Sequence, residues 1–136
     1  MEHAAIALWA VEKYGGPNHP LLGDLDQKAK LYQWMWFGPS TMYPALNSLF
    51  HSQDENTKNA AKEKLSKMMP LIESELGDKS YLLGEQFSLA DAVIAYELWG
   101  MSFFDLLKPH PKVEAYLNRI FDRESWKATR SLECSP

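Results

Sequence analysis

The sequence predicts an all-α fold, a bundle of about five to six helices in one domain. Apolar residues recur at helical spacings of three and four along several segments, and no pair of segments alternates as neighbouring strands do. Prolines and glycines fall between these segments, where helices usually end. With 136 residues, the chain is long enough for one hydrophobic core and too short for a second domain of similar size.

The first helix is expected over residues 4–14. Its apolar positions follow helical spacing, and they are Ala5, Ile6, Trp9 and Ala10 with Leu8 alongside. Gly15-Gly16-Pro17 then ends the helix with a glycine stop and a proline. After a loop, Asp24 or Asp26 can cap a second helix that begins near Gln27, because a carboxylate there accepts hydrogen bonds from free amide groups.

The second helix carries the densest aromatic residues of the chain. Pro39 and Pro44 fall inside it, and each removes a backbone donor, so a kink or break is expected between Gly38 and Pro44. If the helix continues past Pro39, one face combines three side chains at spacings of four and three, namely Trp36, Ser40 and Tyr43.

A third, amphipathic helix follows the polar residues 52–56. Its apolar positions recur at spacings of four, three, four and four, at Ala61, Leu65, Met68, Ile72 and Leu76. Pro70 is expected to bend this helix, and Gly77-Asp78 is expected to end it.

Residues 89–99 predict the centre of the core, since they are apolar almost all the way round the helix. Ser88 and Asp91 are expected to form a capping box at its start, in which each side chain binds the amide of the other residue. Asp91 is therefore assigned a structural role, because no second carboxylate lies near it in sequence to complete an acid and base pair. After a break at residues 108–111, a helix turns Val113, Leu117, Ile120 and Phe121 inward, and a short last helix covers residues 124 to about 130.

Composition and charge exclude several classes of function. The net charge is -4, and acids are interleaved with the basic residues, so no basic stripe for nucleic acid is present. No apolar stretch approaches the ~20 residues of a membrane span, and the chain starts without the features of a secretion signal. The only cysteine, Cys134, favours a reducing compartment and a cytoplasmic location. No metal site is expected, because the histidines lack ligand spacing at His3, His19, His51 and His110.

Several motifs resemble one known family. The segment Tyr81-Leu82-Leu83-Gly84-Glu85-Gln86-Phe87-Ser88-Leu89-Ala90-Asp91 looks like the hallmark of the glutathione S-transferase C-terminal domain, in which Ser-x-Ala-Asp opens the central helix. Two later segments resemble the entry to that family's penultimate helix and its closing segment, at Lys108-Pro109-His110-Pro111-Lys112-Val113 and at Arg123-Glu124-Ser125-Trp126. Residues 2–15 are similar to the last helix of the family's thioredoxin-like domain. The resemblance implies a remnant of that domain in residues 1–16 and a C-terminal-type helical domain in residues 17–136.

The resemblance also implies that this chain carries no catalytic residue of its own. In a complete transferase, the thioredoxin-like half holds glutathione, and its Ser, Tyr or Cys lowers the pKa of the thiol. No cofactor is expected here, and glutathione is expected as a ligand only with a thioredoxin-like domain. Glu2 and His3 stand where the family commonly has Glu-Ser or Gln-Ser at the γ-glutamyl carboxylate, so they are candidates for glutathione binding. The alternative is a frayed, exposed helix end.

The first hypothesis for function is a binding or protein-interaction module that is not catalytic on its own. One alternative is a fragment or subunit of a glutathione transferase that conjugates glutathione to hydrophobic electrophiles. A second is a scaffold of the elongation-factor or synthetase-complex type. By resemblance, the face of Trp36, Ser40 and Tyr43 lines a hydrophobic substrate pocket, whereas packing or a subunit interface is the other interpretation. Together with the opening helix around Trp9, this face is expected to form a homodimer or to bind a protein partner or a hydrophobic small molecule.

Overall fold

The computed structural model describes residues 3–133, and within them every regular element is helical. In chain order the elements are α1 (His3–Gly15), the 3-10 turn η1 (Pro20–Leu22), α2 (Lys28–Phe37), the π-helical segment η2 (Gly38–Met42), α3 (Tyr43–His51), α4 (Glu55–Ser66), α5 (Met69–Leu76), α6 (Leu89–Ser102), α7 (Pro111–Phe121) and α8 (Glu124–Glu133). Because α2, η2 and α3 are continuous and only two residues separate α4 from α5, these elements form six helical runs. The all-α prediction is confirmed.

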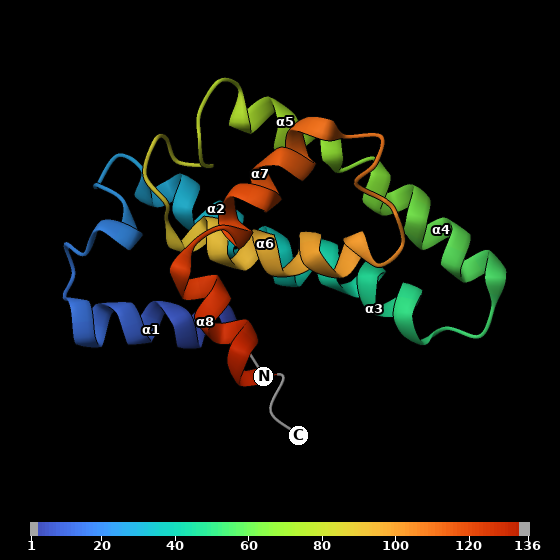
Figure 1. Cartoon of the computed structure of the whole chain (residues 1–136), viewed down its shortest axis with the longest axis horizontal. Helices are drawn as coiled ribbons and strands as arrows, with labels where there is room; N and C mark the ends of the chain where they lie inside the picture. Colours follow the sequence, from blue (N-terminus) through green and yellow to red (C-terminus); the bar gives the residue numbers. More distant parts are fainter. Residues whose placement is uncertain (1–2, 134–136) are drawn as a thin grey trace.

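The two prolines of the aromatic helix produce a widened turn rather than a sharp break. Pro39 has no amide to continue the α-helical ladder. In η2 the amide of Tyr43 instead donates to the carbonyl of Gly38, five residues earlier. The expected interruption between Gly38 and Pro44 is therefore present, and the helix continues through it into α3 (Figure 1).

The helix starts follow the chemistry of their capping residues. The Asp24 carboxylate accepts from the Gln27 amide at 2.9 Å, and the Gln27 side chain accepts from the Asp24 amide at 3.1 Å. This reciprocal pair leads into α2. Pro70 does not bend a helix, because it occupies the first turn of α5, where its missing amide is not required. The predicted single helix is instead interrupted before Pro70, at Lys67 and Met68, between α4 and α5.

Helix α6 runs through the middle of the molecule beside the α2–α3 run, with α7 and α1 also against it (Figure 1). A Cβ placed on Gly38 would lie 3.1 Å from Val93 Cγ1, and one placed on Gly100 would lie 2.6 Å from Leu46 Cδ2. The two runs therefore lie parallel and very close together, and glycine on each side permits that approach.

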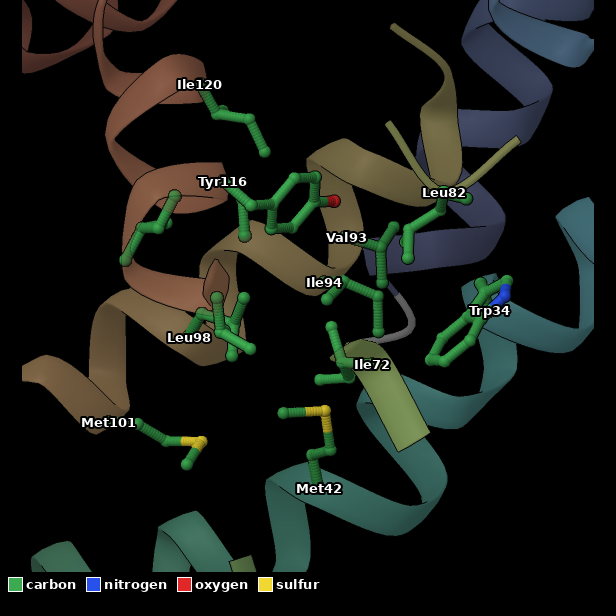
Figure 2. Close-up of a cluster of buried hydrophobic side chains, with 14 of the residues drawn as sticks. Trp34, Met42, Ile72, Leu82, Val93, Ile94, Leu98, Met101, Tyr116 and Ile120 are labelled. Carbon is green, nitrogen blue, oxygen red and sulfur yellow. The ribbon is translucent and has the colours of Figure 1, made fainter. Parts of the chain in front are cut away.

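The core fills the space between α6 and its neighbours. Figure 2 shows Ile72 of α5, Met42 of η2 and Tyr116 of α7 converging on Ile94 and Leu98 of α6. The expectation that α6 is buried on every side is wrong for one of its faces. Tyr96 is 50% exposed and Phe103, just beyond the helix end, is 62% exposed. That exposed face forms part of the site described below.

Candidate ligand-binding groove

The start of α6 is built around the buried carboxylate of Asp91. Ser88 and Asp91 form a capping box there. One carboxylate oxygen accepts from the Ser88 amide and hydroxyl, both at 2.7 Å. The other accepts from the Leu82 amide at 2.9 Å and from the Tyr116 hydroxyl at 2.8 Å. These four donors join α6, α7 and the preceding turn, and they leave the carboxylate no free position from which to act on a ligand.

Two adjoining pockets lie along the exposed face of α6. The first, of about 570 Å³, is lined by His3, Ala7, Pro39, Tyr43, Leu89, Ala92, Val93 and Tyr96. The second, of about 310 Å³, is lined by Tyr43, Leu46, Asn47, Phe50, His51, Tyr96, Trp99, Gly100 and Phe103. Tyr43 and Tyr96 belong to both, so we treat the two pockets together as the aromatic groove. Its size falls in the range of small-molecule sites.

Aromatic rings follow one another along the wall that α6 contributes to this groove. The Tyr96 ring centroid lies 5.8 Å from that of His3 and 6.1 Å from that of Trp99. Phe103 continues the series, with its centroid 5.5 Å from Trp99 and 6.3 Å from Phe50 of α3. Such a surface offers ring faces and edges to an apolar or cationic ligand.

The π-helical segment determines which side chains of the aromatic helix reach the groove. A π turn contains more residues than an α turn, so positions beyond it rotate relative to an unbroken helix. Tyr43 and Pro39 line the groove, whereas Trp36 and Ser40 are not among its lining residues. The Ser40 hydroxyl instead donates to the Trp36 carbonyl at 2.6 Å. The structure therefore brings one of the three residues of the expected face into the site.

Sequence reasoning missed Glu97, the buried acid of α6. Its side chain is fully buried, and neither carboxylate oxygen has a hydrogen-bond partner among the described residues. Desolvation by burial raises the pKa of Glu97 to about 7. The signal was present in the sequence, since Glu97 is the one charged residue between positions 92 and 104.

The family model for the glutathione S-transferase C-terminal domain matches residues 27–124. The chain belongs to the glutathione S-transferase family. Glutathione S-transferase D7 of Drosophila melanogaster is 31% identical over 121 residues, which are 85% of this chain and 54% of that protein. Glutathione S-transferase F10 of Arabidopsis thaliana is 27% identical over 141 residues, covering 93% of this chain and 66% of that protein. The solved structure of the beta class glutathione S-transferase of Sphingomonas chungbukensis has a TM-score of 0.84 at 26% identity, covering 98% of this chain and 68% of that one.

These matches confirm the resemblance inferred from the Ser-x-Ala-Asp motif. The chain spans between about half and two thirds of the length of these glutathione S-transferase relatives. Among the described residues, no helix is long and apolar enough to cross a membrane, and no three His, Cys, Asp or Glu side chains gather as a metal site would require.

The remaining candidate residues of this glutathione S-transferase domain lie in different places. His3 lines the aromatic groove beside Tyr96. Glu2 lies outside the described residues. Trp9 is 52% exposed on α1, where its ring contacts Tyr14 edge-on and the Lys13 ammonium lies 4.6 Å from its centroid.

A larger groove of about 770 Å³ lies between the α1–α2 connection and the loop before α6. Two of its polar side chains, those of Asp24 and Gln27, already bind backbone groups of the groove. The side-chain amide of Gln27 donates to the Leu83 carbonyl at 2.7 Å, and Gln27 also makes the reciprocal bonds with Asp24. The aromatic groove, with its continuous ring surface, is the stronger candidate for ligand binding.

Proposed function

We propose that this chain is the hydrophobic-ligand-binding part of a glutathione transferase, with the aromatic groove as the binding site. A thioredoxin-like domain, in the same chain or in another, supplies the bound and activated glutathione. Family membership favours this hypothesis over a non-catalytic interaction module and over a scaffold. The observation that carries it is the groove itself, in which Tyr43 and Tyr96 connect two pockets lined by aromatic rings.

The groove suits the second substrate of such a transferase better than glutathione. Glutathione carries two carboxylates and an amine, which need charged or hydrogen-bonding partners. The groove lining is mostly aromatic and aliphatic, with His3 of α1 and Asn47 and His51 of α3 as its polar members beside the tyrosines. An apolar or weakly polar electrophile of small-molecule size fits these surfaces.

Several parts of the assignment follow from this proposal. We assign residues 1–16 to the end of the thioredoxin-like domain and residues 17–136 to the C-terminal helical domain. Glu2 and His3 are then candidates for glutathione binding, and His3 also lines the groove. Catalytic residues and glutathione are supplied by the thioredoxin-like domain, in a cytoplasmic homodimer. The half-exposed Ile6 and Trp9 on α1 provide apolar surface for such contacts.

Binding of a hydrophobic fluorescent dye such as anilinonaphthalene sulfonate tests the groove. We expect Tyr43→Ala to weaken dye binding at least several-fold, because Tyr43 forms part of both pockets. The matched control is Tyr32→Ala, which removes an exposed tyrosine of α2 outside the groove lining and should leave binding unchanged. Equal losses in both variants would contradict the proposed site.

A conjugation assay tests the transferase part of the proposal. With glutathione and an aryl halide, the purified chain should show no turnover above the uncatalysed rate, since the thioredoxin-like domain supplies the residue that lowers the pKa of the glutathione thiol. Fusion to the thioredoxin-like domain of a relative should give turnover that Tyr43→Ala reduces. Turnover by the isolated chain, or a fused protein that binds glutathione and stays inactive, would overturn it.

A further inference from the structure

The fully buried Glu97 lies on the stretch of α6 whose neighbouring residues line the aromatic groove. On its own helix, the residues one turn before it and almost one turn after it, Val93 and Gly100, line the groove. Across the helix interface, a Cβ on Gly38 would lie 3.4 Å from Glu97 Cγ, and the next residue, Pro39, also lines the groove. The buried Glu97 side chain thus lies at the close contact of η2 with α6, next to residues that line the groove.

An unpartnered carboxyl group inside a helical bundle requires an explanation. Both oxygens of Glu97 lack a hydrogen-bond partner among the described residues. A buried polar group in this state costs stability, and native structures rarely keep one without a reason. The aromatic rings of the neighbouring groove add a second feature, because ring faces attract organic cations. An acid next to a groove of aromatic rings is the combination that favours a positively charged apolar ligand.

We propose that the aromatic groove selects organic cations, such as aryl ammonium compounds, and that Glu97 acts as their buried counter-ion. This inference rests on the proposed function, since it assigns a substrate class to the same groove. Without a ligand, Glu97 is best kept neutral in its desolvated position. A cation bound beside Tyr43 and Tyr96 stabilises the ionised carboxylate, so binding releases a proton.

The charged and titratable groups around the site leave this role to Glu97. In the groove they are His3 of α1, Tyr43 and His51 of α3, and Tyr96 of α6. On α7, the Tyr116 hydroxyl donates its hydrogen bond to Asp91. On α2, the titratable residues precede Gly38, the neighbour of Glu97, by six positions or more; they are Lys28, Lys30 and Tyr32. The raised pKa of Glu97 has desolvation as its cause, with no contribution from these groups. A ligand cation would be the first compensating charge.

Two ligands of the same shape test the inference. Phenyltrimethylammonium carries a permanent charge, and tert-butylbenzene is its neutral analogue. Titrations followed by NMR should show tighter binding of the cation at pH 8, with its affinity falling about tenfold at pH 6, since a group with a pKa of about 7 is mostly protonated there. The affinity for tert-butylbenzene should not change with pH.

Variants separate Glu97 from the rest of the protein. Glu97→Gln should lose both the preference for the cation and its pH dependence, while it keeps the binding of tert-butylbenzene. Glu63→Gln removes the same charge from the exposed surface of α4 and should behave as the wild type. Histidine side chains also change charge near neutral pH, and His3 lines the groove, so His3→Gln tests this alternative: its affinity for the cation can differ from the wild type, but the tenfold decrease from pH 8 to pH 6 should persist.

The outcomes distinguish this inference from the proposed function. Equal affinities of the wild type for the two ligands, or an unchanged cation preference in Glu97→Gln, would overturn the counter-ion role and leave the groove intact. Failure of both ligands to bind would overturn the groove as well. If Glu97→Gln does not fold, carbon-13 NMR of the wild-type carboxyl group decides, because its pKa should fall with phenyltrimethylammonium and stay constant with tert-butylbenzene.

Discussion

The hydroxyl of Tyr116 donates a hydrogen bond of 2.8 Å to the carboxylate of Asp91, inside the contact between α7 and α6. Figure 2 shows the Tyr116 ring extending from α7 among the core side chains of α6. Burial, and next the negative charge of Asp91, raise the pKa of Tyr116 well above its usual value. The tyrosine therefore remains a hydrogen-bond donor throughout the ordinary pH range, and Asp91 connects two helices as well as capping one.

The first prediction concerns this buried capping network. Ser88→Ala should lower the free energy of unfolding by about 1 kcal/mol, the usual cost of a lost cap. Asp91→Ala should cost about 3 kcal/mol or more, because it leaves several buried donors without an acceptor. Urea unfolding measures both. Ligand binding should persist in variants that remain folded.

An exposed cap provides the control for the same chemistry. Asp54 caps α4 by accepting hydrogen bonds from the amides of Asn56 and Thr57, in contact with water. Asp54→Ala should destabilise the protein less than Asp91→Ala, since water replaces the lost acceptor. Tyr116→Phe should fall between the two alanine variants of the buried network. Unchanged melting temperatures for Ser88→Ala and Asp91→Ala would rule out the capping role.

The second prediction is a pH dependence of stability caused by Glu97. In the unfolded chain the pKa of this carboxyl group lies near its ordinary value of 4.5, whereas in the folded protein its pKa is about 7. Between these values the folded state holds a proton that the unfolded state has released, so stability falls as the pH rises from 4.5 to about 7. The loss amounts to about 3 kcal/mol and should level off at higher pH.

Comparison with a variant isolates this contribution. Glu97→Gln should remove the decrease of stability between pH 5 and 7.5, as measured by urea unfolding at a series of pH values. Glu114→Gln on the exposed face of α7 should retain the slope of the wild type. If the wild type and Glu97→Gln change in parallel across this range, Glu97 is already ionised in the folded protein.

The third prediction tests the close approach of α3 and α6. A Cβ on Gly100 would lie 2.6 Å from Leu46 Cδ2, so Gly100→Ala forces Leu46 to move and should destabilise the fold by about 1–3 kcal/mol. In Leu46→Ala the space is open, and adding Gly100→Ala should then cost much less. A double-mutant cycle measures this coupling. Additive effects of the two substitutions would show that the helices separate rather than repack.

Local patterns in the sequence predicted most of the fold. The spacing of Leu65, Ile72 and Leu76 locates α4 and α5, because helical periodicity depends on neighbours within two turns. The Ser88 and Asp91 box is equally local. The bond from Tyr116 to Asp91 joins residues 25 positions apart, and no spacing rule connects them.

The groove was harder to predict for two physical reasons. The π-helical segment changes the rotation of Tyr43 relative to Trp36, so Tyr43 lines the groove without Trp36 and Ser40. The groove also combines His3 of α1 with Tyr43 of α3 and Tyr96 of α6, whose juxtaposition depends on the packing of whole helices. Only the tertiary structure shows that Glu97 is enclosed without a partner.

The last prediction is self-association through the exposed face of α1. Ile6, Trp9 and Tyr14 are all substantially exposed there. Burying a large side chain such as Trp9 contributes about 1.5–3 kcal/mol, which changes a dissociation constant by roughly ten- to a hundredfold. Light scattering over a concentration series should therefore show a dimer that Trp9→Ser weakens by about this factor.

The matched control is Leu71→Ser on α5, which removes a similarly exposed apolar side chain and should leave the dimer intact. Trp36→Ser tests whether the contact extends to the aromatic helix. A wild type that stays monomeric at every concentration would contradict the prediction, and equal weakening by Leu71→Ser would indicate nonspecific association.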